Sequence, residues 1–593
     1  MSKKDKKKSG VSSIKTLRRV IRLALPHDQL FIFTIILSFL SAPVGLLRPA
    51  LVQKAVDAYI MHHDGQGLWV ASLQLLGAIL LEAILVYTLA YTTSLLGQQI
   101  IRDFRRRVFG HINNQNMTYF DTTPIGSIST RVVNDIETVN SVFSQGVIAL
   151  AADLVSFVVV LTYMLFISWQ LTLVCLISLP FLLLATYFFK EGVKKSFEVV
   201  RTQVSAMNTY LQERISGMRI IQIFGAEAVE MERFESINDK YSKANITANF
   251  HYALFFPIVE ILYAVSLGLM VWYGTNGVLE GTVTVGTLIA FPIYLNMLFR
   301  PMRVIADKFN TIQMGLIAAQ RVFDVLDTDS ALPDKGTIEV NRLSGQLEFK
   351  DVYFHYGKAD EVKDWVLKGI NFNLPAKQTL ALVGSTGSGK TSITSLVNRL
   401  YDIQQGEILL DGQNINAYKI KPLRQRIAVV LQDVFLFSGS IFENITLRNP
   451  DITLEAVRKA AEIIGAHDFI SKLPGTYDYQ VMERGAALSM GQRQLISFVR
   501  ALVSDPDILI LDEATSSIDA ESESIIQNAI TKLIDQRTSI IVAHRLSSIK
   551  HAHQIIVMEH GEIAEQGSPQ ELLSKEGGLF KRLNELQIEV DEF

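Results

Sequence analysis

Hydrophobic and polar positions divide the chain into two unlike halves. Long continuous apolar stretches fill the N-terminal half, whereas the C-terminal half mixes charged, apolar and turn-forming residues. A helix needs about 20 apolar residues to cross the hydrocarbon core of a bilayer. Six stretches reach this length, at about 30 to 52, 68 to 95, 142 to 166, 168 to 189, 252 to 274 and 284 to 304. The pattern predicts six transmembrane helices followed by a domain that lies in water.

Length and composition agree with this division. The chain has 593 residues, of which 49% are hydrophobic, so it is too long for one core and too apolar for an ordinary soluble protein. We expect a cytoplasmic tail and interfacial helix over residues 1–29, the membrane domain over 30–326, a linker over 327–345 and the soluble domain over 346–593. The lone cysteine, Cys175, excludes an intrachain disulfide.

The distribution of basic residues predicts the orientation in the membrane. Lysines and arginines gather in the N-terminal arm and after the second and fourth stretches, whereas the loops after the first, third and fifth contain only Lys54. Because positively charged loops stay in the cytoplasm, both termini are expected there, with the protein in a bacterial cytoplasmic (inner) membrane.

The basic N-terminal segment has two parts. Its start, KKDKKK, is typical either of a nucleic-acid patch or of a topology-setting tail. Six membrane stretches follow it, so we favour the tail and expect no nucleic-acid partner. The next part, IKTLRRVIRLAL, alternates apolar and basic faces at helical spacing. It is expected to lie along the inner membrane surface, in contact with lipid.

Two long segments between the stretches, at about 96 to 141 and 190 to 251, keep helical periodicity but are too polar to enter lipid. We expect them to extend the transmembrane helices into the cytoplasm. Each contains one short break, YFDTTPIGSIS with Pro124 and Gly126, and ERISGMRII with Gly217. A turn at each break would expose a short helix at the cytoplasmic tip, where a second domain can push on it.

The C-terminal half contains a phosphate-binding motif. QTLALVGSTGSGKTSITSLV begins as an apolar strand, passes a glycine-rich turn and opens a helix, the context that makes G-x-x-x-x-G-K-T specific. Its backbone N–H groups and helix dipole suit phosphate, Lys390 reaches the terminal phosphates of ATP, and Thr391 binds Mg²⁺. The alternative is an accidental glycine-rich turn. The residues expected to contact ATP are Gly384, Ser385, Thr386, Gly387, Ser388, Gly389, Lys390, Thr391 and Ser392.

Polar residues at the ends of other apolar strands complete a nucleotide site. DILILDEATSSID places Asp512 and Glu513 at the carboxyl end of a buried parallel strand, where ligands bind in open α/β sheets. Asp512 is expected to hold Mg²⁺, and Glu513 to take a proton from the attacking water. Gln432 in IAVVLQD is expected to sense Mg²⁺ and this water, and His544 in TSIIVAHRLSS to donate to the γ-phosphate. Either residue alone is more often a satisfied polar group at a strand end.

The order of these motifs resembles that of a known family. Five motifs follow one another in the order found in the ATPase domain of ABC transporters: the phosphate-binding motif (P-loop), LQD, the signature loop LSMGQRQ, LDEATS and AHR. The apolar stretches ahead of them are similar to those of exporter-type half-transporters of that superfamily. The resemblance covers essentially the whole chain. It implies an α-helical membrane domain, with coupling helices near Thr122 and Gly217, fused to an α/β P-loop ATPase domain.

The resemblance also implies further site residues. Tyr356 would stack on adenine, Asp519 would face the partner, and Glu483 would lie in the segment that contacts the membrane helices. In this family two ATPase domains face head to tail, so that the P-loop of one and the signature loop of the other enclose each ATP. The signature-loop residues expected to contact ATP are Ser489, Gly491 and Gln492.

The signature loop departs from the family pattern L-S-G-G-Q at Met490, which replaces the first glycine. Methionine resists positive φ and adds a side chain at a crowded interface, so a weakened but active loop is expected. Neutral variation is the alternative, because methionine is flexible. Paired exporters often combine two different chains. One has the catalytic glutamate and a variant signature, and the other has the intact signature but lacks the glutamate. Glu513 with Met490 therefore favours a hetero-pair with a second half-transporter over a homodimer.

Together these features predict an ATP-driven exporter or flippase of amphipathic molecules, drugs or lipids, that works by alternating access. The alternative is an ATP-gated channel or sensor that closes on ATP without coupled transport. The complete set of catalytic motifs disfavours it. Glu82, Asp153 and Glu260 are costly in lipid and are expected to face the bundle interior. They either line a cavity for amphipathic cations or form interhelical bonds.

Overall fold

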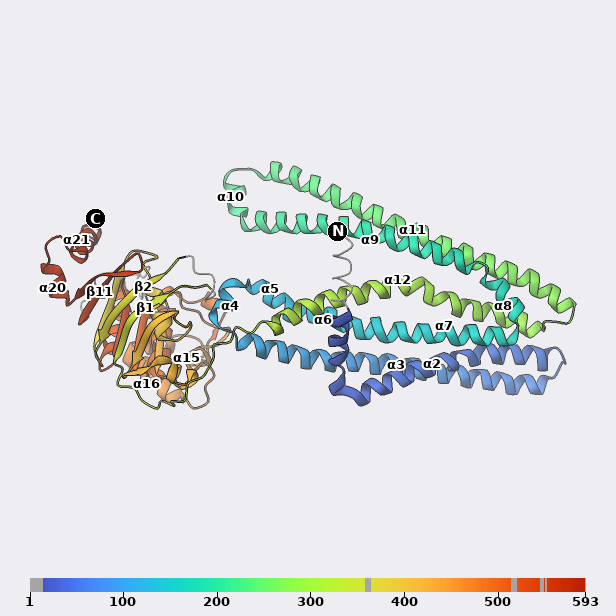
Figure 1. Ribbon diagram of the computed structural model, residues 1–593, viewed down its shortest axis with the longest axis horizontal. Coiled ribbons are helices and arrows are strands. Elements are labelled where there is room, and N and C mark those ends of the chain that lie inside the picture. The colour runs from blue at the N-terminus through green and yellow to red at the C-terminus, as the bar shows by residue number, and fades with distance from the viewer. Residues whose placement is uncertain (1–13, 358–363, 513–519, 544–548, 550–551, 592–593) are drawn as a thin grey trace. The chain divides into compact units, whose positions relative to one another are not determined.

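The chain folds into two compact units, which are a helical unit and an α/β unit (Figure 1). The computed structural model describes residues 14–357, 364–512, 520–543, 549 and 552–591. The helical unit comprises residues 1–113 and 125–328, and the α/β unit comprises residues 114–124 and 329–593. Three residues of the predicted nucleotide site, Glu513, Asp519 and His544, lie outside the described residues.

Long helices form the first unit. They are a helix over residues 14–22, α2 (Asp28–Lys54), α3 (Gly65–Asn113), α7 (Ile148–Ile167), α8 (Trp169–Leu176), α9 (Leu179–Ser216), α11 (Glu227–Leu279) and α12 (Val285–Asp327). Among the described residues, five helical segments are long and apolar enough to cross a membrane: Ile14–Ile60, Gly65–Asn113, Ile125–Ile167, Trp169–Ser216 and Glu227–Leu279. The sixth predicted stretch lies at the start of α12. The unit is thus a helical membrane domain, as predicted.

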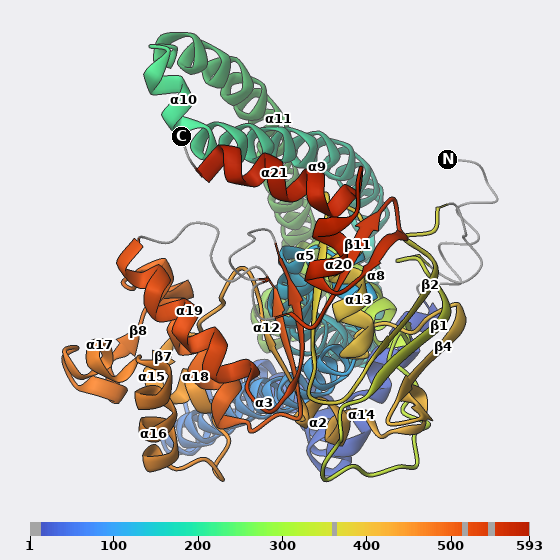
Figure 2. The same ribbon diagram turned by 90° about the vertical axis from the view of Figure 1, so that its left-hand side faces the viewer.

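The helices pack around an aromatic core. Phe291, Tyr294 and Phe299 of α12 are almost completely buried, together with side chains of α7, α8, α9 and α11. Toward α10 (Met218–Ile223), the α9–α11 pair diverges from the other helices (Figure 1 and Figure 2). Ile223 and Phe224 are largely exposed there. The second predicted break therefore forms a short helix with an apolar surface.

An interhelical ion pair holds one of the three acidic residues in the predicted spans. Asp153 on α7 forms an ion pair with Lys308 on α12, whose ammonium also lies 3.4 Å from the carbonyl oxygen of Ala149. Such pairing offsets the cost of placing a carboxylate in the apolar bundle. Asp153 thus forms an interhelical bond, whereas Glu82 is half-buried and Glu260 is exposed.

Two sheets organise the second unit. An antiparallel sheet has the order β2-β1-β4-β5, with β1 (Leu347–Phe354), β2 (Leu367–Leu374), β4 (Gln405–Leu410) and β5 (Gln413–Asn414). A larger sheet has the order β12-β11-β3-β10-β9-β6, with β3 (Thr379–Gly384), β6 (Ile427–Val430), β9 (Ile508–Asp512), β10 (Thr538–Val542), β11 (Gln554–Glu559) and β12 (Glu562–Gly567). From β11 to β6 all neighbouring strands are parallel. Their carboxyl ends therefore share one edge.

Apolar cores cover both faces of the larger sheet. Leu509 and Leu511 face a core that contains α16 (Leu454–Ile464), α18 (Met490–Val503) and α19 (Ala520–Ile534). Ile508 and Ile510 face a second core, shared with α13 (Lys390–Val397) and the antiparallel sheet. Burial on both faces explains why β9 and β10 read as continuous apolar runs.

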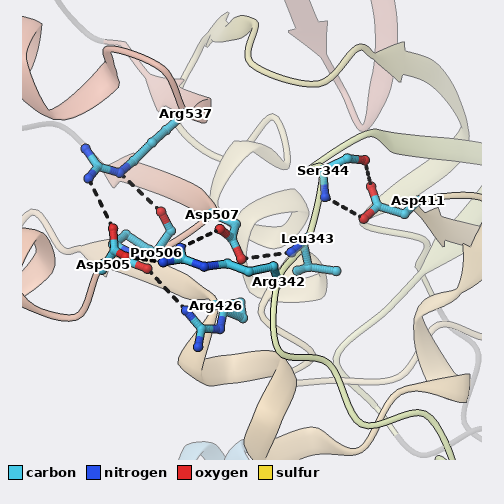
Figure 3. Close-up of polar contacts among 9 residues, drawn as sticks. All are labelled: Arg342, Leu343, Ser344, Asp411, Arg426, Asp505, Pro506, Asp507 and Arg537. Carbon is cyan, nitrogen blue, oxygen red and sulfur yellow. Dashed lines mark hydrogen bonds and ion pairs between the residues drawn. The ribbon is translucent and has the colours of Figure 1, made fainter.

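The end of the predicted linker is bonded to the α/β unit (Figure 3). Arg342 donates to Asp507 over 3.1 Å and to Asp505 over 2.5 Å, and the backbone N–H of Leu343 donates to Asp507 over 2.9 Å. The Arg342 guanidinium holds the pKa of the Asp505 carboxyl below its usual range. Asp505 and Asp507 connect α18 to β9, so the incoming chain is fixed to the loop ahead of the strand that ends at Asp512.

The first predicted break forms α4 (Met117–Thr122), which lies within the α/β unit. The Asn116 side chain caps this helix by accepting from the backbone N–H of Tyr119. The Tyr401 hydroxyl donates to the Asp121 carboxylate over 2.7 Å, and Gln115 accepts from the backbone N–H of Ser330 over 2.9 Å. The segment that interrupts the membrane-domain sequence is thus bonded directly to the α/β unit.

Candidate nucleotide site

The turn between β3 and α13 has the shape of a phosphate-binding loop. Gly384, Gly387 and Gly389 have φ values of 150°, 83° and 104°, a region that side chains disfavour. A Cβ on Gly384 would lie 2.2 Å from the carbonyl oxygen of Met558. Glycine is therefore required at Gly384 by the backbone conformation and by the neighbouring strand β11 together.

Lys390, the first residue of α13, is buried within this loop. Its ammonium donates to the carbonyl oxygens of Gly384 and Ser385 over 2.8 and 3.0 Å. The N-cap residue, Gly389, provides no side-chain cap, so backbone N–H groups of the first helical turn remain available to an anion. The buried Ser388 hydroxyl has no hydrogen-bond partner within the described part of the chain. These groups form a cradle of donors suited to phosphate.

Six of the nine predicted P-loop contacts line one cleft together with Gln432 and Asp512, whereas Gly384, Ser385 and Ser388 are not among its lining residues. Asp512 ends β9 and Gln432 follows β6, at the carboxyl edge where β3 reaches the P-loop. A cleft of about 530 Å³ lies there, within the range of sites for small molecules and cofactors. Its lining residues are Tyr356, Val366, Thr386, Gly387, Gly389, Lys390, Thr391, Ser392, Gln432 and Asp512.

An aromatic cluster borders this cleft. The Tyr356 hydroxyl lies 2.8 Å from the Ser392 hydroxyl, and its ring meets the ring of Tyr401 edge-on, with centroids 5.1 Å apart. Burial raises the pKa of both tyrosine hydroxyls. Since Tyr401 also bonds Asp121, the cluster connects the predicted adenine contact with α4. Sequence patterns gave no sign of this, because Asp121 lies 280 residues before Tyr401.

The signature loop begins α18 with a capping box. The Ser489 hydroxyl oxygen accepts from the backbone N–H of Gln492 over 3.2 Å, and the Gln492 side-chain oxygen accepts from the backbone N–H of Ser489 over 3.0 Å. Gly491 is buried in the first turn. The Arg493 side chain stabilises the loop by donating to the carbonyl oxygen of Leu488 over 2.7 Å.

Met490 occupies the first helical position after this cap. It has no positive φ, so the expected loss of backbone freedom at this position is wrong, because a helical residue needs no glycine there. Its side chain lines a cleft of about 170 Å³ with Gln432, Asp433, Val434, Arg484, Arg493 and Gln494. The methionine side chain therefore lies at the same cleft as Gln432 of its own chain.

Comparisons with known proteins agree with these features. Residues 31–302 match the ABC transporter transmembrane region, and residues 367–516 match the ABC transporter family. The chain is 36% identical over 560 residues to the uncharacterized ABC transporter ATP-binding protein YknV of Bacillus subtilis, covering 93% of this chain and 91% of that protein. It is 33% identical over 593 residues to an ATP-dependent lipid A-core flippase of Syntrophus aciditrophicus, covering 99% of this chain and 97% of that protein.

A solved structure extends this agreement to the fold. A bacterial Atm1-family ABC exporter with ATP bound matches with a TM-score of 0.76 and 27% identity, covering 94% of this chain and 98% of that one. Half-transporters of this kind dimerise, since one chain supplies one membrane region and one ATPase domain. The chain therefore belongs to the ABC transporter family, as an exporter-type half-transporter and integral membrane protein that binds ATP and couples its hydrolysis to transport.

Proposed function

We propose that this half-transporter exports or flips amphipathic molecules, drugs or lipids, across a bacterial cytoplasmic membrane, with both termini in the cytoplasm. The observation that carries the proposal is the single cleft that brings the P-loop together with Gln432 and Asp512, in a chain that also has a membrane domain. Similar proteins include an ATP-dependent lipid A-core flippase and a probable multidrug resistance ABC transporter of Bacillus subtilis. These names support both cargo classes.

The P-loop would hold the phosphates of ATP. Lys390 would exchange the carbonyl oxygens of Gly384 and Ser385 for terminal phosphate oxygens, because a charge-assisted bond to phosphate is stronger than one to a neutral carbonyl. The uncapped first turn of α13 contributes its N–H groups and dipole. Tyr356, which lines the same cleft and is 41% exposed, would offer its ring to adenine.

The oxygen atoms of Thr391, Gln432 and Asp512 fit Mg²⁺. They present a hydroxyl, an amide and a carboxylate to one cleft, and Mg²⁺ prefers oxygen ligands, shared with waters and phosphate. When bound, the ion neutralises charge that develops on the phosphates. Glu513, directly after Asp512, would accept the proton of the attacking water, and His544 would donate to the γ-phosphate.

Ser489 would complete the site of the partner chain. Its hydroxyl oxygen already accepts from Gln492, which leaves its O–H as a donor. In a head-to-tail dimer this O–H and the N–H groups near Gly491 would face the γ-phosphate on the partner's P-loop. The Tyr401–Asp121 bond would then transmit the resulting movement of the ATPase domain to α4.

The partner is proposed to be a different half-transporter. The retained Glu513 combined with the bulk of Met490 supports this assignment, because the variant signature would then cover a site of little turnover. ATP hydrolysis by this chain purified alone should be low, and co-expression with its partner should raise it several-fold. Full cargo-stimulated activity from the chain alone would instead establish a homodimer.

Cargo class can be tested by stimulation of ATP hydrolysis. Glu82 and Glu260 are the residues proposed here to contact cationic cargo, whereas Asp153 is bonded to Lys308. The purified assembly in lipid should hydrolyse ATP faster with amphipathic drugs or lipids than with polar solutes. Glu82→Gln and Glu260→Gln should reduce stimulation by cationic amphiphiles more than by neutral ones. A rate that no amphiphile changes would contradict the proposal and favour the ATP-gated channel.

A further inference from the structure

The helix over residues 14–22 and the turn after it have two different faces. Thr16, Val20 and Ala24, spaced four residues apart, are almost completely buried. On the opposite face Ile14 and Leu25 are 72% and 59% exposed, and this face also carries the exposed cations Lys15, Arg18 and Arg22. Long basic side chains on the exposed face of a helix, with Ile14 and Leu25 on the same side, suit a membrane surface.

The buried face is attached to the end of α12. Arg19 forms two hydrogen bonds with the Asp327 carboxylate, over 2.7 and 2.8 Å, and its guanidinium lies 4.0 Å above the centre of the Phe323 ring. The Thr16 hydroxyl donates to Gln320 over 2.5 Å. These contacts form a clasp, defined here as Thr16 and Arg19 with their α12 partners. Since α12 ends at Asp327, the clasp holds the last turns of the membrane unit.

The helix also runs across the direction of the bundle. Figure 1 shows the segment before α2, in dark blue, lying at a steep angle to α2 and α3. If these long helices cross the bilayer, this segment lies along the membrane plane. Arg19 is engaged in the clasp, whereas Arg18 and Arg22, one turn apart, remain on the exposed face.

We propose that this exposed face binds anionic phospholipid headgroups of the inner leaflet. Three cations on one side of a surface helix complement a negatively charged lipid surface, and each contributes about fivefold to binding there. The clasp joins the same helix to the end of α12, so headgroup binding biases the position of that end. The lipid charge of the inner leaflet therefore adjusts ATP hydrolysis from outside the nucleotide and cargo sites.

The first test measures headgroup binding by the whole assembly. A dye attached through Ile14→Cys reports the environment of the helix, since the native Cys175 is completely buried and inaccessible to the reagent. Phosphatidylglycerol added to phosphatidylcholine nanodiscs should shift the dye emission to the blue. Arg18→Gln with Arg22→Gln should weaken this response about 25-fold, whereas the double Arg→Lys variant should retain it. Arg106→Gln with Arg107→Gln, on the exposed surface of α3, is the matched control.

Two outcomes would overturn the headgroup site. One is an unchanged phosphatidylglycerol response in the double Arg→Gln variant. The other is an equal dye shift caused by soluble inositol hexakisphosphate in pure phosphatidylcholine discs, which would identify a site for soluble polyanions.

The second test addresses the clasp. Arg19→Gln should keep the dye shift, because the exposed face is intact, but should abolish the effect of phosphatidylglycerol on the ATPase rate. A lipid-dependent ATPase rate in Arg19→Gln equal to that of the wild type would overturn the transmitting role of the clasp.

Discussion

Two helix N-termini of the ATPase domain are predicted to meet ATP phosphates, α13 in its own chain and α18 on the partner's P-loop, yet their ends differ. α13 begins after Gly389, which has a φ of 104° and offers no side-chain cap. α18 begins after Ser489, which forms a complete capping box with Gln492. The first helix therefore keeps its donors available for an anion, whereas the second has already used some of its own.

This difference follows from where each helix finds its ligand. The P-loop, Gln432 and Asp512 share a cleft within one chain, so α13 needs no partner to be aligned. The proposed ligand of α18 lies on another chain, and its capping box keeps the helix end ordered until the domains close. We therefore expect the P-loop to determine ATP affinity, and the signature loop to respond to closure of the two domains.

Glu513→Gln should have the largest effect, because it separates binding at α13 from chemistry. Turnover should fall by about 10²-fold or more, the typical contribution of a positioned general base, while ATP affinity stays near the wild-type value. Steady-state hydrolysis measures the turnover, and equilibrium nucleotide binding measures the ATP affinity. Near-normal hydrolysis, in a complex where the other site is inactive, would remove Glu513 from the general-base role.

Gly389→Ala should have the next largest effect, because it damages the uncapped end of α13. A left-handed φ costs a residue with a side chain about 1–2 kcal/mol, and the new Cβ would lie 2.6 Å from a methyl group of Leu367, adding about 1–3 kcal/mol of overpacking. The melting temperature and ATP affinity should both fall. The control is Gly387→Ala, where φ is 83° but no atom lies within 4 Å of the new Cβ. Equal losses in both variants would show that close packing at Gly389 is unimportant.

The nucleotide site could be predicted from sequence where local rules apply. A strand, a glycine-rich turn and a helix define the P-loop, and parallel strands bring Asp512 and Gln432 to the same edge. The helical φ of Met490 was not predicted, because the glycine of the family pattern suggested a positive φ at this position, whereas α18 begins at Met490 directly after the Ser489 cap. The bonds Asp153–Lys308 and Tyr401–Asp121 depend on tertiary packing, which local periodicity does not encode.

Ser489→Ala tests the capped end and should have a smaller effect. Loss of an N-cap costs about 1 kcal/mol of folding free energy. Ser440, which caps α15 (Ile441–Thr446) with the same kind of box, provides the control. Ser440→Ala should lower stability alone, whereas Ser489→Ala should also lower ATP hydrolysis at the site that its loop covers. Equal ATPase rates in the two variants would restrict Ser489 to a structural role.

Met490→Gly should have the smallest effect if the partner is a different half-transporter. The loop then covers a site of little turnover, so the ATPase rate of the pair should change by less than about twofold, well under 1.4 kcal/mol in activation free energy. The comparison is made with purified wild-type and variant assemblies under saturating ATP. A marked change, together with full activity of this chain alone, would identify a homodimer in which methionine adjusts both sites.

Coupling of hydrolysis to cargo movement is the most direct test of the central claim. The purified assembly is placed in liposomes, and movement of a fluorescent amphiphile between leaflets or across the bilayer is followed together with ATP hydrolysis. The account predicts directional movement that requires hydrolysable ATP and falls with the ATPase rate in Glu513→Gln. Wild-type movement in this variant, or with a non-hydrolysable ATP analogue, would contradict an ATP-driven exporter and indicate a channel that ATP only gates.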